Sequence, residues 1–303
     1  MIEKAGRNYE QDIVGDGIHS VQKVIEHRRE DGNRAVKCML IGISALFLTV
    51  MLVLPLLVVV FRALKEGWDA YKTYVTDEYT IKALWLTVVA VATATMVNTV
   101  FGIFASYLVS KFDFLGRQLL AALVDLPLSV SPVIAGLVFI LTFGKIGWMS
   151  PFLKEYGIKI VFAVPGVILA TIFVTFPFVF RELLPVMSAQ GREEEEAAAL
   201  MGADGFTIFR RITFPYIKWA LLYGVILCAA RAMGEFGAVS VISGHLRGKT
   251  NTLPLHVEIL YNEFQTTAAF AVSSILVIMA LGMLVARNLV EWKKKQAGER
   301  PCM

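Results

Sequence analysis

The stretch Glu193–Pro215, EEEEAAALMGADGFTIFRRITFP, separates two of the most hydrophobic segments of the chain. Carboxylates in a first helical turn interact favourably with the positive end of the helix dipole, and the alanines that follow are strong helix formers. Gly202 is well placed to end this helix in a left-handed conformation. Asp204 can then cap a second short helix over about Gly205–Ile212, which Pro215 is expected to end. The stretch therefore predicts a helix, a sharp turn and a second helix.

The composition around this stretch is that of a membrane protein. Hydrophobic residues make up 56% of the 303 residues and charged residues only 18%, with a mean hydropathy of +0.64. Such a chain is solvated largely by lipid, and a helix needs about 20 apolar residues to cross a bilayer core. Six apolar runs predict an all-α, polytopic membrane protein without a cleavable signal peptide. The runs are Cys38–Phe61, Leu84–Val109, Leu119–Phe143, Ile160–Phe180, Trp219–Ile242 and Ala268–Ala286.

The distribution of basic residues predicts the topology. With a cytoplasmic N-terminus, the inside segments hold 19 of the 29 lysines and arginines and the outside loops hold 9. The positive-inside rule then places both termini in the cytoplasm, together with the loop 181–218 that carries the quoted stretch. We therefore expect a cytoplasmic tail at 1–37, containing a short amphipathic helix, a transmembrane domain at 38–292 and a cytoplasmic tail at 293–303.

Several kinds of chemistry have no signature in the sequence. Two of the three cysteines fall in apolar runs and the third lies near the C-terminal end, so we predict neither a disulfide nor a metal site. The sequence has no G-x-x-x-x-G-K-[ST] phosphate loop, no nucleophile elbow and no basic nucleic-acid reader. We expect a chain that is not itself an enzyme, binds no cofactor and contacts no nucleic acid.

The second predicted helix of the quoted stretch has an apolar face. Phe206, Phe209 and Ile212 are spaced three apart, beside the basic Arg210, and the helix is too short to cover that face alone. A solvated acidic loop is the alternative interpretation. The order of residue types argues against it: E-A-A, three residues, G, nine residues, I, one residue, an apolar residue and P. The positions are Glu196, Ala197, Ala198, Gly202, Ile212 and Pro215.

This order resembles the cytoplasmic signature of the permease subunits of bacterial ABC importers. The only departure is Phe214, where Leu is usual. The resemblance implies that the helix–turn–helix is a coupling helix between the fourth and fifth spans, docked on an ATP-hydrolysing subunit. ATP-driven closure of the two ATPases would then move the permease between inward-open and outward-open states.

Three further stretches resemble the sulfate and molybdate branch of these permeases: Asp125–Phe139, Thr171–Met187 and Ala230–Asn262. The last is most similar to the W-type subunit of sulfate/thiosulfate importers, and the likeness covers roughly Leu40–Trp292. It implies the type I importer permease fold in a bacterial plasma membrane. The implied partners are a homologous T-type permease, a periplasmic sulfate/thiosulfate-binding protein and an ATPase dimer, which would use the ATP and Mg.

The fifth predicted span contains two charged residues, Arg231 and Glu235, which lie four apart and therefore on one helical face. Ionisable groups at bilayer depth usually face protein or a watery path and find partners. Two roles remain open: a purely structural ion pair, and a contact of Arg231 with a tetrahedral oxyanion that Glu235 orients. Gly234, beside Glu235, permits close helix approach or local unwinding.

Two segments outside these sites also carry expectations. Asp125, followed by two prolines, predicts a kinked third helix with the aspartate as its entry cap near the cytoplasmic surface. The loop after the fifth span, with Arg247 and Lys249, is expected to contribute to a periplasmic gate or to the dock of the binding protein.

Two other functions fit parts of the pattern. One is a permease of the same class that carries molybdate or another oxyanion as a homodimer. The other is a secondary anion transporter driven by an ion gradient, with Asp125, Arg231 and Glu235 as a proton relay. That second alternative predicts internal repeats, and the sequence contains no convincing one.

Overall fold

The computed structural model describes residues 36–296, which contain helices and no strand. Five of its helices are long and apolar enough to cross a membrane, and the number is six, as the sequence predicts, when a bent pair is counted as one span. The amphipathic helix expected in the N-terminal tail lies outside the described residues. The five long helices are Val36–Ala63, Glu78–Lys111, Val164–Gln190, Gly205–Met233 and Thr266–Lys294, and the bent pair is Arg117–Ser129 with Pro132–Phe143.

The chain divides into two compact units, residues 1–58 and 59–303. The described part of the first unit is one apolar helix interrupted by a π-helical turn, η1 (Thr49–Val53), with the following helix α2 (Leu54–Ala63) running across the unit boundary. The second unit begins at Val59 within α2, and its next helix, α3 (Trp68–Val75), packs on the last long helix, α15 (Thr266–Gln296).

The central element of the second unit is α4 (Glu78–Lys111). Asp77 caps its first turn by accepting hydrogen bonds from the backbone N–H groups of Tyr79 and Thr80. Small residues let other helices approach α4 closely: a Cβ at Gly102 would lie 2.7 Å from Cγ1 of Val179. As a result α4 packs on α8 (Val164–Thr175), α9 (Pro177–Gln190), α12 (Phe214–Met233) and α14 (Leu253–Asn262).

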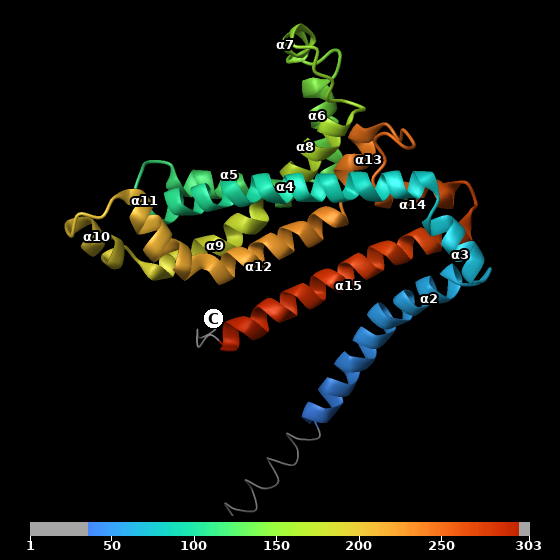
Figure 1. The fold of residues 1–303 in the computed structure, drawn as a ribbon, viewed down its shortest axis with the longest axis horizontal. Coiled ribbons are helices and arrows are strands. Elements are labelled where there is room, and N and C mark those ends of the chain that lie inside the picture. The colour runs from blue at the N-terminus through green and yellow to red at the C-terminus, as the bar shows by residue number, and fades with distance from the viewer. Residues whose placement is uncertain (1–35, 297–303) are drawn as a thin grey trace, which may run out of the picture. The chain divides into compact units, whose positions relative to one another are not determined.

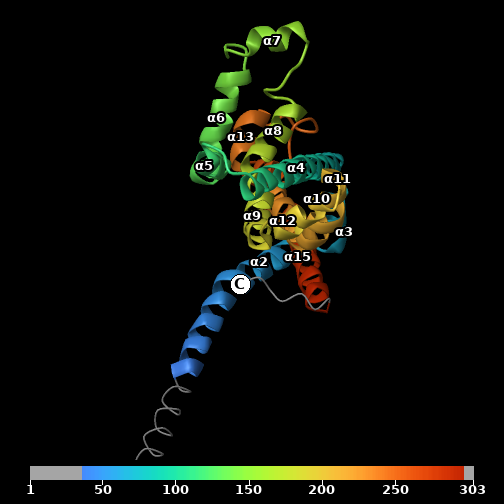
Figure 2. The same cartoon turned by 90° about the vertical axis from the view of Figure 1, so that its left-hand side faces the viewer.

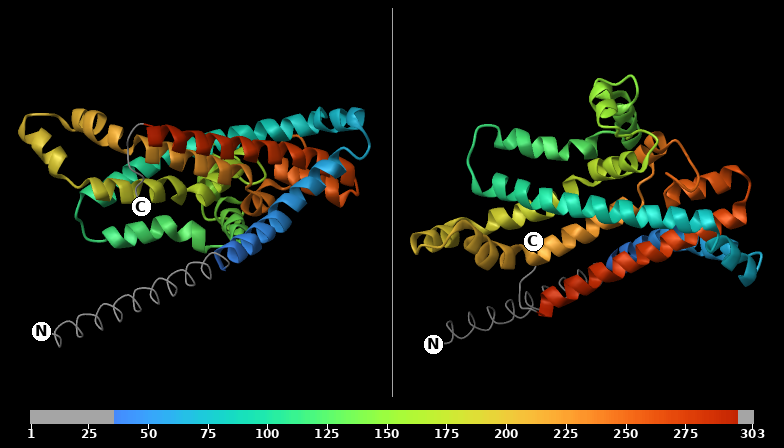
Figure 3. Two further views of the ribbon diagram at one scale, coloured as in Figure 1. Left: turned by 90° about the horizontal axis from the view of Figure 1, so that it is seen from below. Right: turned by 45° about the horizontal axis from the view of Figure 1, so that its top comes forward.

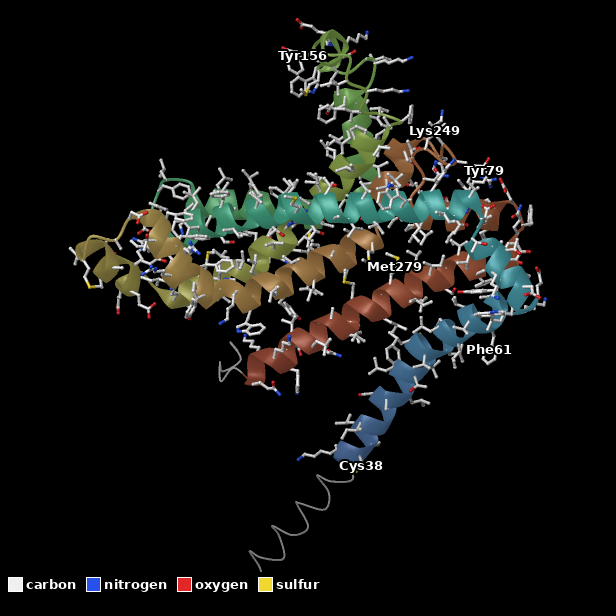
Figure 4. All side chains as sticks on the ribbon, viewed as in Figure 1. Cys38, Phe61, Tyr79, Tyr156, Lys249 and Met279 are labelled. Carbon is white, nitrogen blue, oxygen red and sulfur yellow. The ribbon has the colours of Figure 1, made fainter. Side chains whose placement is uncertain are left out.

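The third span is broken, as its prolines predict. Helix α5 (Arg117–Ser129) ends before Pro132, the first residue of α6 (Pro132–Phe143), and the two helices meet at 105°. Helix α6 leads to the short α7 (Ser150–Glu155), which projects away from the other helices of the second unit with Tyr156 near its tip (Figures 2 and 4).

The prediction that Asp125 caps the start of its helix is wrong. Gly116 occupies the cap position of α5, so Asp125 lies two turns inside the helix. Its carboxylate instead pairs with Arg181 of α9, with 2.9 Å between Nε and Oδ1. The fourth span extends past its predicted end at Phe180 to Gln190, because the charge of Arg181 ends the apolar run but does not disfavour a helix.

The fifth span begins earlier than Trp219. Helix α11 (Gly205–Ile208) continues through a π-helical turn, η2 (Phe209–Thr213), into α12, so the predicted end near Ile212 is wrong. In the π turn the N–H of Phe214 bonds to the carbonyl of Phe209, one residue further back than in an α-helix. Pro215 then falls in the first turn of α12, where its missing N–H costs little.

The second unit places two groups of short elements at opposite ends of α4. Helix α10 (Glu193–Leu200) and α11 lie at one end, and α3 and α14 lie at the other (Figures 1 and 3). Between them the backbone of α12 breaks after Met233, and the short α13 (Gly237–Ser243) packs on α6 and α8.

Candidate coupling loop and intramembrane ion pair

The quoted stretch forms a helix, a turn and a second helix. Four glutamates occupy the first turn of α10, and Gly202 ends the turn with a φ of +88°, in the region that favours glycine. The N–H groups of Gly202 and Ala203 bond back to the carbonyls of Ala199 and Ala198. Asp204 occupies the cap position of α11 and accepts a hydrogen bond from the Thr207 hydroxyl, which lowers the pKa of its carboxyl.

The turn carries an exposed apolar surface, which we call the docking surface. It consists of Leu200, Met201 and Phe206, whose side chains are 90%, 83% and 71% exposed. The predicted face of Phe206, Phe209 and Ile212 is only partly correct. Phe209 and Ile212 are half-buried, and the Phe209 ring packs edge-on against Tyr107 of α4 with centroids 6.2 Å apart. Leu200 and Met201, which the sequence interpretation did not single out, are exposed instead.

The other residues of the pattern divide by exposure. The buried one is Ala198, 7% exposed, which sits on the inner side of α10. The exposed ones are Glu196, Ala197 and Pro215, and Arg210, which lies between pattern positions, is exposed as well.

A buried polar cluster that the sequence interpretation missed attaches this loop to α4. Lys111, the last residue of α4, lies 3.0 Å from Oε1 of Glu195, and the two side chains are only 4% and 11% exposed. The same carboxylate oxygen accepts the hydroxyl of Thr213 at 2.6 Å. Lys111 also donates to the carbonyl of Gly191 and, at 3.4 Å, to Oε1 of Gln190. We call this set the Lys111 cluster.

A second, exposed set of ion pairs holds the same loop. Arg192 lies 2.8 Å from Oδ2 of Asp113, and Arg117 lies 2.9 Å from Oδ1 of the same residue. The hydrogen bond from Arg192 is the main cause that lowers the pKa of Asp113. Exposed pairs of this kind contribute little because water screens them.

The two charges of the fifth span pair with each other. Nη1 of Arg231 lies 2.6 Å from Oε2 of Glu235, while Oε1 accepts the backbone N–H of Ala238 at 3.0 Å. Glu235 is 2% exposed on its side chain and Arg231 is 34% exposed. The two residues do not lie on one continuous helix, because α12 ends at Met233. Gly234, Glu235 and Phe236 form the break before α13, the local unwinding that the glycines permit.

Polar contacts also gather at the far end of α4. Oγ1 of Thr80 lies 3.2 Å from Nε2 of His256, and Oγ1 of Thr87 accepts the N–H of Leu253 at 2.8 Å. Burial is the main cause that lowers the pKa of His256. Figure 4 labels Tyr79 of α4 and Lys249 of the neighbouring loop at this end.

Comparison with known proteins defines the class of this protein, the membrane subunit of a transport system. Residues 98–295 match the model of the family described as binding-protein-dependent transport system inner membrane component. The chain is 46% identical to the sulfate transport system permease protein CysW of Escherichia coli K12, covering 87% of this chain and 91% of that protein. It is 34% identical to the sulfate transport system permease protein CysT of Salmonella typhimurium, covering 83% of this chain and 91% of that one.

The chain therefore belongs to the family of inner membrane components of binding-protein-dependent transport systems, the permease subunits of ABC importers. Its fold is similar to that of a solved bacterial alginate ABC transporter, in complex with an alginate pentasaccharide-bound periplasmic protein. The TM-score is 0.71 at 16% identity, covering 88% of this chain and 96% of that one. This similarity concerns the fold alone.

Proposed function

We propose that this chain is one of two membrane subunits of an ATP-driven importer for sulfate or thiosulfate. The observation that carries the proposal is the 46% identity to a sulfate permease over 87% of the chain. The lower identity to a T-type permease, 34%, supports a W-type role beside a T-type partner. A periplasmic binding protein would supply most of the selectivity by closing around the anion before it docks.

In this proposal the docking surface of Leu200, Met201 and Phe206 lies in the cytoplasm and inserts into an ATPase subunit. Large apolar side chains this exposed at a polar loop are typical of a protein interface. The ATPase dimer binds and hydrolyses ATP with Mg, since this chain has no phosphate-binding loop in its sequence. Closure of the ATPases would move α10 and α11 and switch the permease between its two states.

Arg231 is our candidate for contact with the anion inside the membrane. Glu235 contacts one nitrogen of the Arg231 guanidinium, and Arg231 has no second polar partner within residues 36–296. A third of the side chain is exposed, and the planar fork suits a tetrahedral oxyanion. The competing role is structural, because Glu235 is buried and needs a cation to offset its charge.

The proposal is tested by reconstitution. The chain is co-expressed with a T-type permease and the ATPase, and ATP hydrolysis is measured with sulfate-loaded, thiosulfate-loaded and molybdate-loaded binding protein. We expect a complex with one copy of each permease, stimulated by the sulfate or thiosulfate form. Two copies of this chain without a second permease, or stimulation only by the molybdate form, would contradict the sulfate assignment. ATP-independent uptake driven by an ion gradient would contradict the transporter class.

A further inference from the structure

The Lys111 cluster joins three segments of the chain at a single carboxylate oxygen. Oε1 of Glu195, on α10, contacts the ammonium of Lys111 at the end of α4 and the hydroxyl of Thr213 in η2. The other contacts of Lys111 go to Gly191 and Gln190 at the end of α9. Helix α10 therefore cannot shift relative to α4, α9 or η2 without breaking a buried polar contact.

Burial makes these contacts strong constraints. Removing one partner of a buried ion pair leaves an uncompensated charge away from water, whereas an exposed pair is lost at little cost. The side chains of Lys111 and Glu195 are 4% and 11% exposed, against 40% and 70% for the neighbouring pair Arg192–Asp113. The two sets hold the same loop, and the Lys111 cluster is the one that fixes its position.

The helix that carries Lys111 is an uninterrupted path from the loop to the far end of the second unit. Helix α4 runs for 34 residues, about 50 Å, with no proline and no break. The path through the fifth span is interrupted twice, by the π turn before Pro215 and by the break at Gly234. A continuous helix transmits displacement along its axis better than a chain of short segments joined by breaks.

The far end of α4 is attached to α14 by two buried hydrogen bonds. The hydroxyl of Thr80 is hydrogen-bonded to the ring of His256, and the hydroxyl of Thr87 accepts the backbone N–H of Leu253. His256 and Leu253 both belong to α14, and all four residues are buried. Figure 1 places α14 and the coupling loop at opposite ends of α4. One helix thus connects the docking surface with the opposite side of the protein.

We infer that Lys111 is a positioning residue for energy coupling: through Glu195 it makes α4 move with α10, so that displacement of the docking surface reaches α14. The inference rests on the proposed docking of an ATPase at Leu200, Met201 and Phe206. It does not depend on which anion is carried.

The test uses the full reconstituted complex with Lys111→Met and Glu195→Gln. The matched control is Lys82→Met, which removes a lysine of the same helix whose ion pair with Glu78 is exposed. Substrate transported per ATP hydrolysed is measured in proteoliposomes, together with ATPase recovery during purification. We expect both cluster variants to retain the ATPase and to lose about fivefold or more of this ratio, and Lys82→Met to match the wild type.

A second measurement tests whether a change at α10 reaches α14. Amide hydrogen exchange of residues 193–200 and 253–262 is compared with and without ATP bound to the complex. In the wild type both segments should respond; in the cluster variants 193–200 should respond and 253–262 should not. A purely structural role would alter exchange equally with and without ATP. The charge-swapped pair Lys111→Glu with Glu195→Lys should restore part of the response.

Unchanged transport per ATP in both cluster variants, or a persistent response of 253–262, would overturn the inference. If Lys111→Met fails to assemble, Glu195→Gln decides, since its amide keeps a hydrogen-bonding group beside Lys111 and Thr213. A wild-type complex that responds to neither sulfate-loaded nor thiosulfate-loaded binding protein would refute the proposed substrate alone, because the exchange response requires only ATP and the ATPase.

Discussion

Replacing Gly202 by valine tests whether the turn of the coupling loop sets the direction of α11. The φ of Gly202 is +88°, and no atom lies within 4 Å of the position that a Cβ would take. The cost of a side chain is therefore conformational and not steric. Left-handed backbone costs an L-residue about 1–2 kcal/mol, so the native turn should lose about 5-fold to 30-fold in population relative to competing turns.

The matched control is Gly205→Val, three residues further on. Gly205 also has free space around its Cβ position, but its backbone does not lie in the positive-φ region. We expect Gly202→Val to lower substrate transported per ATP in proteoliposomes several-fold, and Gly202→Asn to be milder because asparagine tolerates left-handed backbone. Gly205→Val should stay close to the wild type. Equal ratios for Gly202→Val and Gly205→Val would refute the reasoning that backbone strain at this turn misdirects the loop.

Three further predictions follow from exposure and packing. Leu200→Asp and Phe206→Asp should leave the permease folded but abolish co-purification of the ATPase; full recovery of the ATPase would argue against the docking surface. Arg231→Gln should cost about 3 kcal/mol of stability by stranding the buried Glu235, and adding Glu235→Gln should recover assembly; if transport stays absent in this assembled double variant, Arg231 contacts the anion. Gly102→Val places a Cβ 2.7 Å from a valine of α9, and thermal unfolding should show about 1–3 kcal/mol of destabilisation, with an unchanged transition contradicting the close approach.

The sequence was sufficient to predict the spans, because each depends on a continuous run of apolar residues. It was a poorer guide to where they end. Arg181 interrupts the apolar run of the fourth span, yet the helix continues to Gln190, and Arg181 pairs there with Asp125 of a distant segment. Pro215 suggested a helix end, yet one π-helical turn accommodates it. Both differences arise from contacts or backbone adjustments that hydrophobic periodicity does not encode.

Some features of the candidate site could also be predicted from the sequence, and others could not. The turn at Gly202 depends on residues close in sequence, and local rules predicted it. The pairing of Arg231 with Glu235 is also local, but the helix that its four-residue spacing assumed ends at Met233. The Lys111 cluster joins α4 to a loop beyond α9, so no local spacing identifies it. A signal was nonetheless present: a single lysine ends a long apolar helix, and one of four consecutive glutamates is available to it. Only the structure selects Glu195 among the four.

The two broken spans explain how non-helical backbone is accommodated in this fold. A break in a membrane helix exposes backbone groups that lipid cannot hydrogen-bond, so it has to be covered by protein. Helix α13 packs directly on α6, with the carbonyl of Ala238 2.7 Å from the Cβ position of Gly136, so each span covers the other near its break. Glu235 completes the arrangement by accepting the N–H of Ala238 while it binds Arg231. The intramembrane ion pair is thus part of the structure of the break, and any contact of Arg231 with an anion has to be made without displacing Glu235.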